Sequence, residues 1–112
     1  MSTRSLSRES LERRSLLQTH WQSFTELLER YGAYNPQLFG SVARGTAGPE
    51  SDLDILVEMD PADGNVLMRA AGLMEETRNL LGTQRVDIFP LQLLKDQVSQ
   101  QALTEAVPLW QD

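Results

Sequence analysis

The chain of 112 residues contains no cysteine and a single histidine, His20. Without thiols it can form neither a disulfide framework nor a thiolate metal site, and this absence is typical of cytoplasmic proteins. No apolar run approaches the ~20 residues that are needed to span a bilayer. The first 14 residues mix serine, arginine and glutamate without the apolar segment of a secretory signal. We therefore expect no membrane association and a cytoplasmic location.

Basic residues are also few, with 10 Lys and Arg against 16 Asp and Glu and a formal net charge of −6. Nucleic-acid-binding proteins are usually basic, because neutralising phosphates supplies much of their affinity. The charge balance therefore argues against RNA or DNA as a direct partner. A hydrophobic content of 40% is typical of a globular chain. The length favours one domain over residues 1–112, in which the polar residues 1–10 are expected to be frayed.

The hydrophobic pattern predicts helices and strands that follow one another along the chain. Helices are expected over residues 11–31, 66–81 and 91–106. Strands are expected over residues 37–39, 52–59 and 85–89, with a short helical turn over residues 42–44. This order predicts an α/β (α+β) fold, in which helices pack on a small mixed β-sheet.

Several smaller features carry expectations of their own. Asn35-Pro36 is expected to form a turn before the first strand, and Gly82 to end the second helix. Within that helix, Leu67, Met68 and Met74 are expected to fill the core. The apolar tail at residues 107–110 has two open interpretations, packing on its own chain or docking on a partner.

The most informative segment runs from Gly40 to Val57, with the sequence GSVARGTAGPESDLDILV. Gly40 permits close approach of a backbone, and Ser41 can donate to a phosphate oxygen from a helix start. Asp52 and Asp54 stand two residues apart on a predicted strand, so their side chains point to the same face. Like charges this close raise a pKa or require a cation. Donors that are all oxygen suit Mg²⁺ or Mn²⁺ rather than zinc.

A third acid, Asp87, is flanked by Val86 and Ile88 in a short apolar strand. Buried carboxylates are costly unless they are paired or bind a metal, so Asp87 completes a three-carboxylate cluster if the two strands are neighbours. Such clusters hold two metal ions in nucleotidyl transfer. Asp52 and Asp54 would bridge the ions, while Asp87 would hold the ion nearer the attacking hydroxyl.

Two further residues of the segment are candidates for nucleotide binding. Arg44 could contact the triphosphate or form a local salt bridge, and both interpretations stay open. Ser51 is counted with the nucleotide-binding residues, although its hydroxyl is expected mainly to cap the loop before the strand.

The segment resembles the signature of the DNA polymerase β-type nucleotidyltransferase superfamily, Gly-Ser followed by Asp-x-Asp on a strand. The resemblance is closer to the minimal nucleotidyltransferase (MNT) group, with the pattern G-S-x-x-R-G-x(5)-S-D-x-D-x-x-V. Asp87 matches the third carboxylate of that group by its place on a later hydrophobic strand. Every fixed position of the pattern is filled, by Gly40, Ser41, Arg44, Gly45, Ser51, Asp52, Asp54 and Val57.

The resemblance implies the polymerase β-type nucleotidyltransferase fold and a role as the antitoxin of a prokaryotic toxin–antitoxin pair. The implied reaction transfers AMP from ATP, with two Mg²⁺ ions, to a tyrosine hydroxyl of a HEPN-domain toxin and so neutralises it. Two alternatives stay open: an antitoxin that acts by binding alone, and a nucleotidyltransferase that acts on a small-molecule hydroxyl. The short chain counts against the second alternative, because relatives of that kind carry an added domain for the acceptor.

Overall fold

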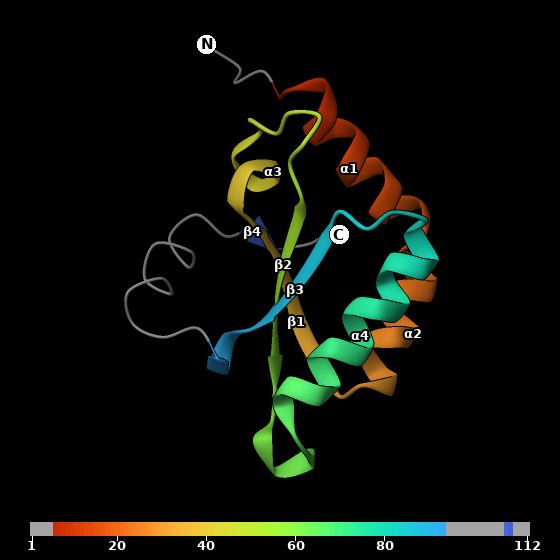
Figure 1. Ribbon diagram of the computed structural model, residues 1–112, viewed down its shortest axis with the longest axis vertical. Coiled ribbons are helices and arrows are strands. Elements are labelled where there is room, and N and C mark those ends of the chain that lie inside the picture. The colour runs from red at the N-terminus through yellow and green to blue at the C-terminus, as the bar shows by residue number, and fades with distance from the viewer. Residues whose placement is uncertain (1–5, 94–106, 109–112) are drawn as a thin grey trace.

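The computed structural model describes residues 6–93 and 107–108 and contains helices, two short 3₁₀ turns and a sheet (Figure 1). The helices are α1 (Arg8–Thr19), α2 (Trp21–Arg30), α3 (Gly40–Arg44) and α4 (Val66–Leu81). The strands are β1 (Ala33–Phe39), β2 (Leu53–Met59), β3 (Val86–Pro90) and β4 (Val107–Pro108). The 3₁₀ turns are η1 (Pro61–Asp63) and η2 (Leu91–Leu93).

The strands form one mixed sheet in the order β3-β2-β1-β4. β2 runs parallel to β3, whereas β1 is antiparallel to both β2 and β4. The parallel pair needs a crossover connection, which α4 provides. Helices α1, α2 and α4 lie together on one side of the sheet (Figure 1). The predicted class, helices packed on a small mixed sheet, is therefore confirmed.

The core lies between these helices and the sheet. Leu17, Phe24 and Leu73 from the helices and Leu38 and Val57 from the strands are all almost completely buried. The helix predicted over residues 11–31 carries an apolar stripe at helical spacing, and all members of this stripe are buried or pack against the core: Leu17, Trp21, Phe24, Leu28 and Tyr31. Helix α4 has the predicted bounds and ends at Gly82, whose left-handed backbone forms the C-cap.

The predicted helix over residues 11–31 is in fact two helices, α1 and α2, which meet at His20. The expectation of a frayed start is wrong for residues 7–10, because Ser7 caps α1 and Ser10 is completely buried. Ser7 Oγ donates to the carbonyl oxygen of Ala47 at 2.7 Å, and Ser10 Oγ accepts from the N–H of Ala47 at 3.0 Å. These contacts with a distant loop order the helix start. Residues 1–5 lie outside the described residues.

Strand β1 is longer than the predicted strand over residues 37–39. Asn35 and Pro36 lie inside β1, where the pairing with β2 shifts between Tyr34 and Gln37. Asn35 has a φ of 55°, and Pro36 has no N–H to donate to the ladder. The predicted turn is therefore a β-bulge, which accommodates the proline within the strand.

The predicted core positions at the start of α4 are wrong in part. Leu67 is 65% exposed and Met68 is 69% exposed, whereas Met74 packs against the core. The buried residues of α4 begin at Ala70, one turn into the helix. The first turn of α4 therefore packs against the core through Val66 and leaves Leu67 and Met68 exposed.

The end of the chain also differs from the prediction. Residues 91–93 of the predicted helix over residues 91–106 form the 3₁₀ turn η2, and residues 94–106 lie outside the described residues. Val107 and Pro108 of the apolar tail pair with Leu38 and Gln37 as β4. For these two residues the tail therefore packs on its own chain, one of the two open interpretations, although no strand was predicted there. In the part of the chain that the structure describes, no helix is long and apolar enough to cross a membrane.

Candidate active site

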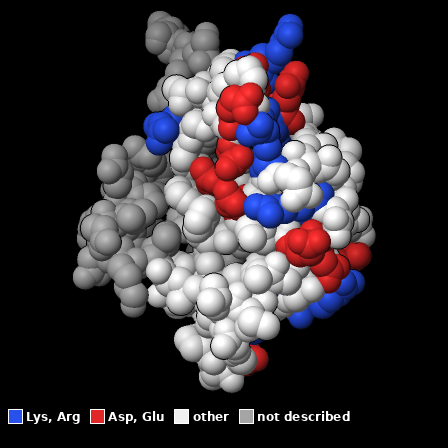
Figure 2. All heavy atoms as spheres, in the orientation of Figure 1, with Lys and Arg blue, Asp and Glu red and all other residues white. Residues whose placement is uncertain are grey.

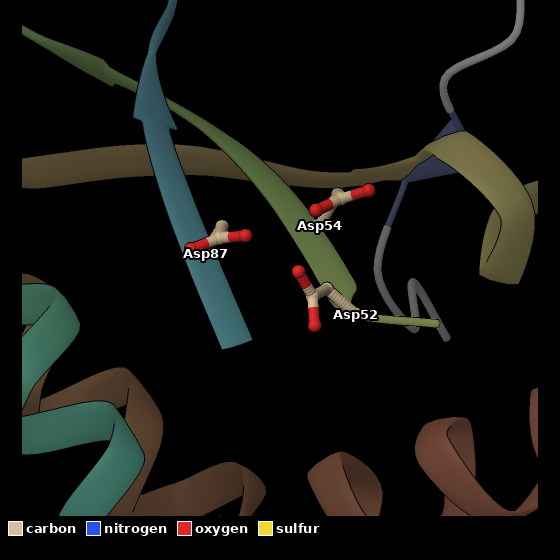
Figure 3. Close-up of side chains that lie close together, drawn as sticks. All are labelled: Asp52, Asp54 and Asp87. Atoms are coloured by element: carbon tan, nitrogen blue, oxygen red, sulfur yellow. The ribbon is translucent and has the colours of Figure 1, made fainter. Parts of the chain in front are cut away.

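Three carboxylates, those of Asp52, Asp54 and Asp87, gather at one place on the sheet (Figure 3). Each offers an oxygen atom, and these three atoms all lie within 4.8 Å of one another. Asp54 and Asp87 are direct neighbours in the parallel register of β2 and β3. Asp52 stands immediately before β2. The predicted three-carboxylate cluster is therefore present.

The Gly-Ser end of the motif lies directly against this cluster. Phe39, the last residue of β1, is the register partner of Asp54, so the chain enters α3 beside that carboxylate. Gly40 has a φ of 78°, and a β-carbon at this position would lie 2.6 Å from Oδ2 of Asp54. Only glycine fits this position without a shift of the carboxylate. Ser41 follows in the first turn of α3, as predicted.

The surroundings of the cluster raise the pKa values of Asp54 and Asp87. Burial, followed by the charges of Asp87 and Asp52, raises the pKa of Asp54 to about 6, while Arg44 opposes the shift. Burial, a hydrogen bond with Asp52 and the charge of Asp52 raise the pKa of Asp87, against the effect of Arg78. A bound cation would offset the repulsion between the carboxylates and favour their charged forms.

Two arginines from different parts of the chain lie against the carboxylates. Arg78 of α4 donates from Nη2 to Oδ1 of Asp87 at 2.9 Å. Arg85 places Nη1 3.9 Å from Oδ1 of Asp52 and also binds Glu50. Figure 2 shows acidic side chains gathered on one face with basic side chains directly beside them.

Sequence reasoning missed Arg78 and Arg85. Arg85 precedes Asp87 by two residues, and this spacing on an extended segment could have signalled a residue on the same side. Arg78 carries no such signal, because only the packing of α4 brings it to β3.

Hydrogen bonds within the loop between α3 and β2, and others from α1, hold this loop in place. The N–H of Gly48 donates to Oγ of Ser51 at 2.9 Å, which confirms the predicted loop-capping role of the Ser51 hydroxyl. Arg13 of α1 donates to the carbonyl oxygens of Ser51 and Pro49 at 2.9 and 3.2 Å. Arg14 donates to two carbonyl oxygens of α3. Helix α1 therefore holds both flanks of the site, which no local sequence pattern indicated.

The donor set of the cluster fits a hard divalent cation. Among the described residues it comprises three carboxylates and no imidazole or thiolate. Mg²⁺ and Mn²⁺ prefer oxygen ligands, whereas zinc sites are usually built with histidine or cysteine. The pKa of Asp54 is raised first by burial and then by the charges of Asp87 and Asp52, and a bound cation would oppose both effects by favouring the charged carboxylate.

Comparisons with known proteins agree with this geometry. The family model for the nucleotidyltransferase domain matches residues 22–109. The protein adenylyltransferase MntA of Thermococcus cleftensis is 38% identical over 82 residues, which span 73% of this chain and 80% of that protein.

Two solved structures share the fold. One, described as a minimal nucleotidyltransferase, superposes with a TM-score of 0.72 at 38% identity and covers 86% of this chain and 95% of its own. The other is a toxin–antitoxin complex with AMP-PNP, with a TM-score of 0.64 at 27% identity over 81% of this chain and 73% of that chain. With the filled motif and the carboxylate cluster, these matches show that the chain belongs to the nucleotidyltransferase domain family, within its group of minimal nucleotidyltransferases.

Proposed function

We propose that the chain is a Mg²⁺-dependent nucleotidyltransferase antitoxin, which transfers AMP from ATP to a hydroxyl of a HEPN-type toxin and so neutralises it. The observation that carries this proposal is the cluster of Asp52, Asp54 and Asp87 beside Gly40 and Ser41. The similarity to an adenylyltransferase and to a toxin–antitoxin complex with an ATP analogue supports the reaction class. The HEPN class of the toxin and the tyrosine acceptor follow from the motif resemblance.

The proposed reaction needs a metal site and a proton acceptor. Two Mg²⁺ ions held by Asp52, Asp54 and Asp87 would lower the pKa of the attacking hydroxyl and stabilise the leaving pyrophosphate. The hydroxyl oxygen bonds to the α-phosphorus of ATP, and the bond from that phosphorus to the bridging oxygen of the β-phosphate breaks. Asp87 would accept the hydroxyl proton, because it is the carboxylate that we place nearer the attacking hydroxyl.

The Gly-Ser turn and Arg44 would bind the triphosphate. Gly40 keeps the backbone next to Asp54 free of a side chain, which leaves room for phosphate oxygens close to the carboxylates. Ser41 offers a hydroxyl at the start of α3, and the charge of Arg44 already acts on Asp54. Ser51 would contribute by shaping the loop.

The acceptor would come from another protein. We propose that the 112 residues act as one domain, and the likeness to a solved toxin–antitoxin complex supports an acceptor on a partner protein. We propose a cytoplasmic location, because ATP and a toxin made in the same cell would meet the chain there. Because the net charge is −6, we do not propose direct binding to nucleic acid.

The test combines the purified chain, the product of the neighbouring open reading frame, ATP and Mg²⁺, followed by intact mass spectrometry. We expect the neighbour to gain the mass of one or more AMP units, and no gain with Asp54→Asn. A stable complex without a mass gain would favour an antitoxin that acts by binding alone. Transfer only to a small-molecule hydroxyl would favour the other alternative.

A further inference from the structure

Arg78, near the C-terminal end of α4, spans the whole connection from α4 to β3. Its carbonyl oxygen accepts from the N–H groups of Gly82 at 2.9 Å and Thr83 at 3.2 Å. Its side chain reaches β3, where Nε donates to the carbonyl oxygen of Val86 at 2.8 Å and Nη2 donates to Oδ1 of Asp87 at 2.9 Å. One planar guanidinium therefore binds the backbone of one residue and the carboxylate of the next.

This double contact opposes a specific tendency of Asp87. Its carboxylate lies within a group of three whose oxygen atoms approach within 4.8 Å. When all three carboxylates are charged, as cation binding requires, the hydrogen bond between Asp87 and Asp52 is lost. Repulsion from Asp52 and Asp54 then favours any staggered rotamer that turns the Asp87 carboxylate away from them. The bond to Arg78 stabilises the rotamer that keeps Asp87 in the group, and the bond to Val86 keeps Arg78 itself in place.

We propose that Arg78 is a positioning residue for nucleotidyl transfer, which holds the Asp87 carboxylate beside Asp52 and Asp54 so that the three can bind a divalent cation together. This inference rests on the proposed function for the use of the cation, but it does not depend on which acceptor is modified. Arginine suits the role better than lysine, because its rigid fork binds two acceptors at fixed directions whereas an ammonium group does not. Residues that orient metal ligands typically change metal affinity or activity by 10- to 100-fold when they are replaced.

The test uses Arg78→Lys, which keeps the positive charge and loses the fork. We expect the dissociation constant for Mn²⁺, measured by electron paramagnetic resonance on the whole chain, to rise about tenfold. We expect kcat with Mg²⁺ and ATP to fall by about the same factor, while KM for ATP stays unchanged. Wild-type Mn²⁺ affinity and kcat in this variant would overturn the inference.

A matched control separates positioning from general stability. Arg30 of α2 forms an ion pair with Glu76 at 2.9 Å, the same distance as in the Arg78–Asp87 pair, but outside the carboxylate cluster. We expect Arg30→Lys to leave Mn²⁺ affinity and kcat unchanged; an equal loss in both variants would overturn the inference. If Arg78→Lys does not fold, Arg78→Gln takes its place, because its planar amide keeps one donor.

A double-mutant cycle tests whether Arg78 acts through Asp87. In an Asp87→Asn background, Arg78→Lys should cause no further loss of Mn²⁺ affinity. The same tenfold loss there would show that Arg78 acts by another route and would overturn the inference. A wild-type chain that binds Mn²⁺ but transfers no AMP would refute the proposed function alone, since Mn²⁺ binding still reports on Arg78.

Discussion

Gly40 and Gly82 share a left-handed backbone, with φ of 78° and 71°, but they differ in what faces them. A β-carbon on Gly40 would meet the Asp54 carboxylate, whereas a β-carbon on Gly82 would meet no atom within 4 Å. The two positions therefore allow backbone strain to be separated from contact with the site.

We expect Gly40→Ala and Gly82→Ala to lower the free energy of unfolding by a similar amount, about 1 kcal/mol each. Gly40→Ala should also push the Asp54 carboxylate aside, because a side chain yields more easily than the backbone. A shift of about 1 Å at a reacting centre can cost about 100-fold in rate. Assays of AMP transfer should show such a loss in Gly40→Ala only; equal activities of the two variants would contradict the assigned contact.

We expect Asp54→Asn to be more stable than the wild-type chain at pH 7 without divalent cations. Folding raises the pKa of Asp54 from 3.8 to about 6, so the folded state holds the proton more tightly than the unfolded state. The stabilisation from this carboxyl is thus complete below about pH 3.8 and is lost as the pH rises through 6. The gain at pH 7 should be on the order of 1 kcal/mol, after allowance for solvent screening at this partly exposed group.

Urea unfolding in EDTA at pH 4 and pH 7 measures this difference. The control is Asp63→Asn in the exposed turn η1, which should not show the same change between the two pH values. A stability difference between Asp54→Asn and wild type that does not change with pH would count against the electrostatic account.

We expect Mg²⁺ to stabilise the wild-type chain and to have little effect on Asp54→Asn. A ligand that binds only the folded state adds about 1.4 kcal/mol of stability at ten times its dissociation constant. Thermal unfolding with increasing Mg²⁺ measures this effect, and Na⁺ at the same ionic strength checks for general screening. A variant stabilised as strongly as the wild type would show that the ion binds elsewhere.

We expect Ser10→Ala to lower the free energy of unfolding by about 1–3 kcal/mol, because it leaves a buried N–H without its acceptor. That N–H belongs to Ala47 in the loop that precedes β2. Ser15→Ala is the matched control, since Ser15 is exposed on the same helix and should change stability by less than about 0.5 kcal/mol. Chemical denaturation of the two variants measures this difference in the free energy of unfolding.

The carboxylates of the site were easier to predict from the sequence than the residues that hold the site in place. Asp52 and Asp54 lie in one short segment, and their common face follows from strand geometry alone. Asp87 needed only the further assumption that two apolar strands are neighbours, which the parallel register confirms. The contacts of Ser10 and Arg78 join residues through tertiary packing, and no periodic pattern reports such contacts.

The helix boundaries were likewise not predictable from the periodic sequence pattern alone. The apolar stripe of residues 17–31 continues through His20, so periodicity alone does not reveal the break between α1 and α2. Leu67 likewise fits the apolar stripe of α4, yet it is exposed and lines a surface hollow with Ile88 and Pro90 of β3. Periodicity predicts which face of a helix is apolar, but not how far along the helix the covering surface extends.

The bond from Arg78 to the Val86 carbonyl also affects self-association. Within the described residues, β3 pairs on one side only, and an exposed strand edge is a template on which another chain can add a strand. The guanidinium occupies a carbonyl oxygen at the start of β3, and Pro90, which lacks an N–H, closes its other end. Arg78 and Pro90 thus remove one acceptor and one donor from this edge of β3, which disfavours the addition of a strand beside the carboxylates.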